Sequence, residues 1–289
     1  MFSNDSTFGF IGLGLIGGSI ARAIRHNYPD ADIIAYNRYD NKTNPNLLLA
    51  YEDRTLTGIT NDLKEIAKTD CIFLCAPVLS NIDYLSKLKP YLGENTLITD
   101  VGSVKNDIAK AVLELGLTRH FIGGHPMTGM EKTGYQNSSI SLLRGSFYIL
   151  TPTDDTPASF VETMTDFVDK CGSKPFVVSS ERHDEVVAAI SHGPHVIAAC
   201  LVNLVKEDDT DGHLKTLAAG GFKDITRIAS SSPEMWHDIC ISNKEALVQF
   251  LRDYNKKIEN SINAIENAND EEIYNIFKSS KSYRDNIKG

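Results

Sequence analysis

A glycine-rich turn near the start of the chain constrains the fold most. A short apolar segment, Phe8 to Ile11, runs into GLGLIG at residues 12–17, and residues of helical composition follow. A strand, a GxGxxG turn and a helix in this order predict a dinucleotide-binding unit, in which glycines permit a tight turn and close approach of a pyrophosphate. A glycine-rich turn in an unrelated α/β fold is the alternative. The cofactor contacts predicted from this turn are Gly12, Leu13, Gly14, Leu15, Ile16 and Gly17.

The end of the second predicted strand, Asp32 to Tyr36, bears on the choice of cofactor. An acidic residue there would bind the ribose 2′-hydroxyl of NAD, whereas this chain has neutral Asn37 and cationic Arg38. A cation at this position suits a 2′-phosphate. We therefore favour NADP and keep NAD open, since Asp40 could still turn inward.

Predicted strands and helices alternate through the first half of the chain. This pattern predicts a parallel sheet with helices on both faces, in a dinucleotide-binding domain over residues 1–179, and such sheets bind ligands at the carboxyl ends of their strands. Three predicted strand ends carry Ala76-Pro77, Gly102-Ser103 and Gly124-His125-Pro126. We expect Ala76, Pro77 and Gly102 to contact the cofactor, and Ser103 and His125 to meet beside the nicotinamide.

The segment FIGGHPMTGMEKTG, residues 121–134, contains the strongest catalytic candidate. A short apolar run, His120 to Ile122, leads into it, and we expect a strand that hands over to an irregular loop whose glycines let the backbone pass close to a ligand. His125 is suited to moving a proton near neutral pH. A glycine-rich turn with a surface histidine is the alternative.

The second half, residues 180–289, has a helical pattern. Val196 to Val205 is apolar on nearly every side, which is typical of a helix buried in a core or a subunit interface. Gly193-Pro194 before it predicts a break or kink. Apolar residues spaced three or four apart from Leu247 to Ile265 predict one long amphipathic helix, used for core packing or dimerisation.

Two further polar features lie in this half. His192 and His195 flank the predicted break and are either functional or a satisfied pair of core histidines. Arg227, in a short helix that opens at Gly220-Gly221, offers a planar fork for a carboxylate, or else pairs with Asp224 on the same helical face.

Composition excludes several classes of function. The net charge of −9 argues against a nucleic-acid partner. No apolar run approaches the ~20 residues of a membrane span, and the short polar start does not resemble a signal peptide. The odd count of five cysteines, without a metal-type pairing, predicts small core residues in a reducing compartment and no metal site. We expect a cytoplasmic protein.

Taken together, the motifs resemble the prephenate/arogenate dehydrogenase family of tyrosine biosynthesis. The matching segments cover nearly the whole chain: GLGLIGGS, TDVGSVK, GGHPMTGMEKTG, SHGPH, GGFKDITRIA and SPEMW. The resemblance implies an α/β Rossmann-type domain with a doubly wound parallel sheet, followed by an all-α dimerisation domain and hence a homodimer. It implies oxidative decarboxylation of prephenate to 4-hydroxyphenylpyruvate, or of arogenate to tyrosine, with NAD or NADP.

The resemblance also assigns roles to residues. His125 is similar to the catalytic histidine that bonds the ring hydroxyl of the substrate, and Ser103 to the serine that orients it. Arg227 resembles the arginine that binds a substrate carboxylate, His195 the residue that favours prephenate over arogenate, and Glu131 the acidic residue of the active-site loop. The other predicted substrate contacts are Gly220 and Trp236.

The chain departs from the family pattern at two places. Gly193 stands where a larger apolar residue is usual, which could loosen the kink, and Asn37-Arg38 replaces the acidic ribose ligand of NAD-preferring members. Two other classes stay open: a β-hydroxyacid dehydrogenase-like oxidoreductase, and a protein that binds the nucleotide without turnover.

Overall fold

The computed structural model describes residues 1–39, 42–130 and 132–287. It contains two compact units. Unit 1 comprises residues 1–187 and 231–242, and unit 2 comprises residues 188–230 and 243–289. The domain boundary between residues 179 and 180 stays a prediction.

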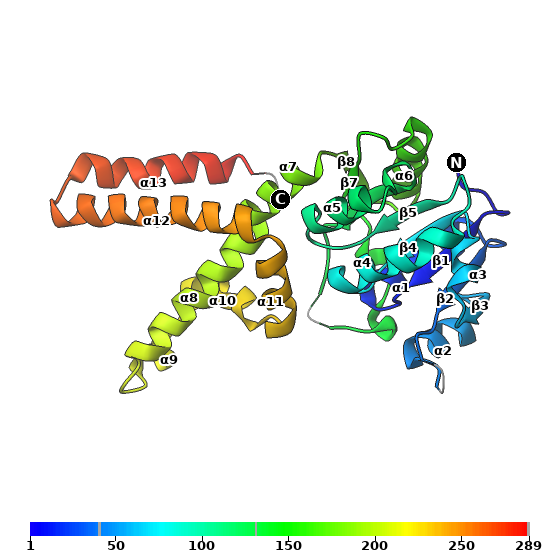
Figure 1. Cartoon of the computed structure of the whole chain (residues 1–289). Coiled ribbons are helices and arrows are strands. Elements are labelled where there is room, and N and C mark those ends of the chain that lie inside the picture. The colour runs from blue at the N-terminus through cyan, green and yellow to red at the C-terminus, as the bar shows by residue number, and fades with distance from the viewer. Residues whose placement is uncertain (40–41, 131, 288–289) are drawn as a thin grey trace. The chain divides into compact units, whose positions relative to one another are not determined.

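Among the described residues of unit 1, eight strands form one sheet in the order β3-β2-β1-β4-β5-β6-β7-β8 (Figure 1). The strands are β1 (Thr7–Ile11), β2 (Asp32–Tyr36), β3 (Gly58–Thr60), β4 (Cys71–Leu74), β5 (Leu97–Asp100), β6 (Phe121–Pro126), β7 (Phe147–Pro152) and β8 (Lys174–Val177). Neighbours pair in parallel except β6 with β7. The strand order reverses between β1 and β4, and ligands bind at the carboxyl ends of strands at such a switch point. The predicted doubly wound sheet is confirmed.

Helices cover both faces of this sheet. They are α1 (Leu15–Asn27), α2 (Pro45–Glu52), α3 (Leu63–Ala67), α4 (Val78–Leu88), α5 (Asn106–Glu114) and α6 (Ala158–Lys170), and unit 1 also holds α7 (Ser180–Val187) and α11 (Pro233–Ser242). Successive strand residues face opposite sides. Accordingly Phe10 belongs to a buried cluster with α1, α2 and α6, and Ile11 to a second cluster with α3, α4 and α5.

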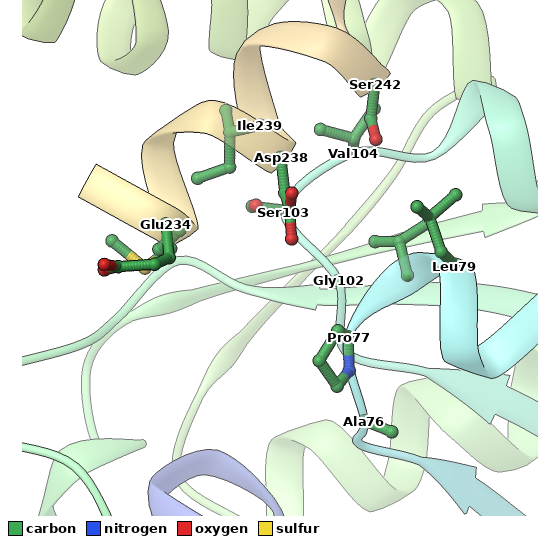
Figure 2. A pocket seen from close by; sticks show the side chains of 12 residues that line it. Ala76, Pro77, Leu79, Gly102, Ser103, Val104, Glu234, Asp238, Ile239 and Ser242 are labelled. Carbon is green, nitrogen blue, oxygen red and sulfur yellow. The ribbon is translucent and has the colours of Figure 1, made fainter. Parts of the chain in front are cut away.

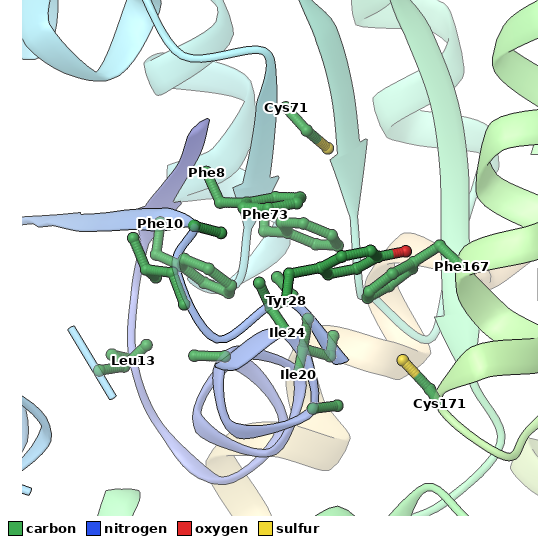
Figure 3. Close-up of a cluster of buried hydrophobic side chains, with 14 of the residues drawn as sticks. Phe8, Phe10, Leu13, Ile20, Ile24, Tyr28, Cys71, Phe73, Phe167 and Cys171 are labelled. Carbon is green, nitrogen blue, oxygen red and sulfur yellow. The ribbon is translucent and has the colours of Figure 1, made fainter. Parts of the chain in front are cut away.

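The first cluster is rich in aromatic rings. Figure 3 shows Phe8, Phe10 and Phe73 from β1 and β4 beside Phe167 of α6. The rings of Phe10 and Phe73 stack with centroids 5.1 Å apart. Each such buried side chain contributes about 1.5–3 kcal/mol, so this cluster fixes α1, and with it the glycine-rich turn, against the sheet.

Strand β6 extends past the apolar run that leads into it. It continues through Gly123, Gly124 and His125 to Pro126, so it ends at the predicted strand end Gly124-His125-Pro126, and the expectation of an irregular loop directly after Ile122 is wrong. A Cβ on Gly123 would lie 2.2 Å from Oγ1 of Thr151, and one on Gly124 would lie 2.6 Å from the carbonyl oxygen of Asp100. These two glycines therefore allow close strand packing, and the irregular loop begins only after Pro126.

The regular elements among the described residues of unit 2 are all helices. The elements are the π-helix Ala188–His192, α8 (Gly193–Asp208), α9 (His213–Leu217), α10 (Gly220–Thr226), the 3₁₀ helix Arg227–Ser230, α12 (Lys244–Glu266) and α13 (Asp270–Asp285). Helix α12 confirms the long amphipathic helix predicted from Leu247 to Ile265.

The predicted break at Gly193-Pro194 takes the form of the π-helix, after which α8 begins at Gly193 with Pro194 in its first turn. Proline is tolerated at that position because its missing N–H is not needed there. A Cβ on Gly193 would lie 2.2 Å from the ring of Phe250 on α12 and 2.8 Å from the carbonyl oxygen of Ala188. The expectation that Gly193 loosens the kink is therefore wrong, because glycine is what lets α8 and α12 approach.

Helix α8 is less buried than its composition predicts. Leu204 is 57% exposed, and Cys200 is exposed, so the expectation that all five cysteines are core residues is wrong for Cys200. By length and composition alone, the run Ser180–Asp208 is apolar enough to cross a membrane. Core and interface helices meet the same criterion, so the run by itself assigns no membrane.

Candidate functional site

The glycine-rich turn has the geometry expected for a dinucleotide. Gly12 has φ +90°, and its Cβ would lie 2.7 Å from the carbonyl carbon of Cys75. A Cβ on Gly17 would lie 2.8 Å from the carbonyl oxygen of Gly12. By contrast, no other part of the described chain, apart from Gly14 itself and its immediate backbone neighbours, has a heavy atom within 4 Å of the Cβ position of Gly14. The turn and the helix–strand contact thus require glycine, while the space beside Gly14 is open.

The start of α1 completes this cradle. Gly14 is its N-cap and provides no side-chain hydrogen bond to the first turn. The first N–H groups of a helix lack intrahelical partners and favour a phosphate. Leu15 and Ile16 are half-buried in this first turn, whereas Leu13 is buried in the aromatic cluster, so only its backbone could face a cofactor. These residues fit a pyrophosphate.

The predicted cofactor residue Asn37 is tied into its own loop. Its side chain is buried, and Nδ2 donates to the carbonyl oxygens of Tyr39 (2.8 Å) and Lys42 (3.0 Å). Its Oδ1 accepts from the backbone N–H of Asn44 at 3.2 Å. Asn37 therefore shapes the loop after β2, and its role toward a cofactor stays a prediction.

Cationic groups gather on the aromatic ring of the same loop. The guanidinium of exposed Arg38 lies 4.9 Å from the centroid of the Tyr39 ring, and its Nη2 donates to the Tyr39 hydroxyl at 2.9 Å. The ammonium of Lys42 lies 4.8 Å from the same centroid. Asp40 lies outside the described residues. The sequence prediction named Arg38 but missed Lys42.

A pocket of about 390 Å³ lies in unit 1 at the carboxyl ends of β4 and β5 (Figure 2). The predicted residues Ala76, Pro77, Gly102 and Ser103 come together in its wall. Helix α11 supplies the other part of the wall, with Glu234, Met235, Asp238, Ile239 and Ser242. The volume falls in the range of small-ligand pockets. Trp236, a predicted substrate contact, is half-buried on the same helix.

A buried ion pair holds the loop that carries Ser103. Asp100, at the end of β5, pairs with Lys105, and both side chains are buried. The Asp100 carboxylate also accepts from the backbone N–H of Gly102 at 2.8 Å and of Gly124 at 3.2 Å. One carboxylate therefore fixes the residues next to both Ser103 and His125. The sequence prediction missed this pair.

His125 is part of a chain of hydrogen bonds. Its Nδ1 lies 2.8 Å from Nε2 of His183, and Nδ1 of His183 lies 2.7 Å from Oδ1 of Asp184. His183 and Asp184 are fully buried on α7, whereas His125 is half-buried. Asp184 also accepts from the backbone N–H groups of Lys105 and Asn106, each at 2.8 Å, at the start of α5.

The sequence prediction missed His183 and Asp184. The available signal was an adjacent His-Asp pair at the head of an apolar helical run. Burying such polar groups is costly unless they are hydrogen-bonded, so the pair could have been expected to have a specific partner.

Unit 2 holds the other predicted substrate residues. Nδ1 of His195 lies 2.9 Å from the carbonyl oxygen of Ser191. Burial lowers the pKa of His195 below its usual value, and the positive charge of Arg227 lowers it further. Arg227 is exposed and follows α10, which begins at Gly220.

The two histidines of this segment differ in their surroundings. His192 is buried, and its Nδ1 lies 3.0 Å from the side-chain nitrogen of Asn243. His192 is therefore a hydrogen-bonded core histidine, as the alternative interpretation predicted, while half-buried His195 stays a candidate substrate contact. Glu131 lies outside the described residues.

Two family models match almost the whole chain. The model "Prephenate dehydrogenase, nucleotide-binding domain" matches residues 20–177, and the model "Prephenate dehydrogenase, dimerization domain" matches residues 179–279.

Individual proteins are similar over the same length. A prephenate dehydrogenase from Bacillus subtilis is 36% identical over 279 residues, which are 96% of this chain and 74% of that protein. A cyclohexadienyl dehydrogenase from Zymomonas mobilis is 32% identical, over 95% of this chain and 93% of that protein. The crystal structure of prephenate dehydrogenase from A. aeolicus, in complex with hydroxyphenyl propionate and NAD+, is 30% identical, covers 98% of each chain and has a TM-score of 0.89. With both family models matched and this degree of identity, the chain belongs to the prephenate dehydrogenase family.

Proposed function

We propose that the chain is an NAD(P)-dependent prephenate dehydrogenase that converts prephenate to 4-hydroxyphenylpyruvate and CO2 in tyrosine biosynthesis. The observation that carries this proposal is the position of His125. It lies at the carboxyl end of β6, and the neighbouring strand β5 leads into the Ser103 loop that lines the pocket. The open GxGxxG turn at the end of β1 supports a dinucleotide in the same unit.

The reaction needs a proton acceptor. Loss of a hydride from the ring carbon that bears the hydroxyl group makes a ketone, so the hydroxyl proton must leave. A neutral imidazole within hydrogen-bond reach accepts it, and His125 is our candidate. The nicotinamide cofactor, when bound, accepts the hydride. When CO2 leaves, the electron pair of the broken C–C bond passes through the ring to the ketone oxygen, which takes a proton back from His125, and the ring becomes aromatic. The protein has therefore mainly to orient the ring.

The other roles rest on the family resemblance. Ser103 would hold the same hydroxyl group, and its place in the pocket wall supports this role. Arg227 would bind a substrate carboxylate, and His195 would favour the keto acid prephenate over arogenate, with Gly220, Trp236 and Glu131 as further contacts. Arogenate is the alternative substrate, and the similarity to a cyclohexadienyl dehydrogenase supports testing it.

NADP is the cofactor that we favour. The cations Arg38 and Lys42 both lie on the Tyr39 ring at the end of β2, where a 2′-phosphate binds in dinucleotide folds. Arg38→Ala should weaken binding of NADP more than binding of NAD, measured by quenching of protein fluorescence. Equal effects on both cofactors would count against this preference.

The enzyme would act as a cytoplasmic homodimer formed through its helical unit. Its long helix α12 leaves an apolar stripe exposed in the single chain, at Tyr254, Ile258, Ile262 and Ile265. Exposed apolar stripes of this length are typical of protein interfaces. Sedimentation should give twice the mass of the chain, and a monomeric mass would contradict the dimer.

A two-by-two assay tests the function. Purified protein is given prephenate or arogenate with NAD or NADP, and reduced nicotinamide is followed by absorbance. Fastest turnover with prephenate supports the proposal, and faster turnover with arogenate favours the alternative. No turnover in any of the four combinations would contradict both.

A further inference from the structure

We propose that His183 and Asp184 are positioning residues that fix the tautomer of His125 through the chain Asp184–His183–His125. The inference deepens the proposed function and rests on it for the step in which His125 accepts a proton. The chain of contacts itself lies within unit 1.

The tautomers follow from the contacts. A carboxylate oxygen only accepts, so Nδ1 of His183 carries the proton that bonds Oδ1 of Asp184 at 2.7 Å. In a neutral imidazole the other nitrogen is then an acceptor. Nε2 of His183 therefore accepts at 2.8 Å from Nδ1 of His125, which must carry the proton. The lone pair of neutral His125 is thereby assigned to Nε2.

Burial makes this order rigid. The side chains of His183 and Asp184 are fully excluded from solvent. Asp184 is held in turn by the backbone N–H groups of Lys105 and Asn106, and the charge of Lys105 is matched by Asp100. A carboxylate fixed in this way cannot turn away from His183 without leaving donors at the start of α5 unsatisfied.

The arrangement serves proton transfer in two ways. It presents the same His125 nitrogen as base in every turnover, and it stabilises the imidazolium that forms when the substrate proton arrives. A carboxylate that orients a histidine does the same in hydrolytic triads, where the wrong tautomer costs up to about 10⁴-fold in kcat.

Asp184 has a second, structural use, because it caps α5. The informative substitutions are therefore at His183. The terminal amide of His183→Gln reaches the former position of Nε2 and can still accept from His125. The amide of His183→Asn reaches only the position of Nδ1 and can still bond Asp184. His183→Phe keeps the volume and makes neither bond.

We expect kcat to follow the hydrogen bond to His125. His183→Gln should lower kcat by about tenfold, and His183→Asn and His183→Phe by about 10²-fold or more. The KM for substrate and the Kd for the cofactor should not change. The matched control is His213→Gln, which removes the histidine of an exposed His–Asp pair in unit 2 and should leave kcat unchanged.

Two kinetic outcomes would overturn the proposal. One is a kcat within the error of wild type for His183→Phe. The other is a parallel fall of kcat and melting temperature in all three variants regardless of hydrogen-bonding ability, which would show a merely structural role.

An NMR measurement on the wild-type protein is independent of activity. With ¹⁵N-labelled histidine, the His125 ring, assigned by its loss in His125→Asn, should show a protonated Nδ1 and an unprotonated Nε2 at neutral pH. The opposite tautomer would overturn the proposal even if the enzyme is active. The expected tautomer in a protein that turns over neither substrate would leave the positioning intact and overturn the proposed function alone.

Discussion

The substitution Lys105→Met tests how the end of β5 is held. The Lys105 side chain is 1% exposed and that of Asp100 is 0% exposed, so the substitution leaves a carboxylate buried without its cation. Removing one partner of a buried ion pair lowers the free energy of unfolding by about 3–5 kcal/mol. For a chain of this size, a loss of this magnitude lowers the melting temperature on the order of 10 °C.

The second substitution Asp100→Asn isolates the charge. In Lys105→Met/Asp100→Asn neither member of this pair is charged, and the amide keeps one oxygen for the N–H of Gly102 or Gly124. We expect most of the lost stability to return, leaving a deficit of about 1–2 kcal/mol for the missing acceptor.

The assay is urea-induced unfolding, monitored by circular dichroism, of the wild type, both single variants and the double variant. We expect the double variant to be more stable than Lys105→Met alone. If the double variant is equally or less stable, an unpaired Asp100 charge is not the source of the loss, and the account of this loop is refuted.

Three further predictions concern cofactor binding, helix packing and pH. Gly14→Ala should leave the urea midpoint of unfolding unchanged, since the new Cβ has open space beside it. It should raise the Kd for the cofactor about tenfold in a binding titration, which corresponds to about 1.4 kcal/mol. An unchanged Kd would contradict the proposed pyrophosphate position. Gly193→Ala should lower the free energy of unfolding by about 1–3 kcal/mol, because the new methyl group overpacks against Phe250. Adding Phe250→Leu should restore part of this stability. If it restores none, contact with Phe250 is not the cause of the loss. The pKa of His195 should lie below 6.5 by NMR titration and rise in Arg227→Gln. With a lowered pKa in the folded state, His195 binds its proton more tightly in the unfolded chain. Its contribution to the free energy of unfolding is therefore complete above the unfolded pKa and is lost as the pH falls through the folded pKa. A measured pKa above 6.5 would mean that this contribution is lost as the pH rises instead.

The architecture could be predicted from the sequence because the patterns that indicate it are local in the chain. The GxGxxG turn needs glycine at Gly12 and Gly17 for reasons that apply to any such strand–turn–helix unit. The alternation of strands and helices then predicts a parallel sheet, and the stripe from Leu247 to Ile265 predicts α12.

Long-range packing could not be predicted in the same way. The need for glycine at Gly123 comes from Thr151 on a neighbouring strand, and at Gly193 from Phe250 on another helix. Neither contact has a local signal, so the first glycine was assigned to ligand approach and the second to a looser kink.

The candidate site was predicted in part for the same reason. Ser103 and Ala76 could be placed at one edge because parallel strands end together, and the pocket contains both. His183 lies 58 residues from His125 along the chain, and only the fold brings their rings together. The sequence therefore predicted the residues at the strand ends but missed the side chains that support them.

The central claim is that His125 accepts the substrate proton in a prephenate dehydrogenase. The most direct test is the steady-state rate of His125→Asn with prephenate and the preferred cofactor. We expect kcat to fall by roughly 10²–10⁴ while the Kd of the cofactor is unchanged. Turnover of this variant near the wild-type rate would contradict the claim.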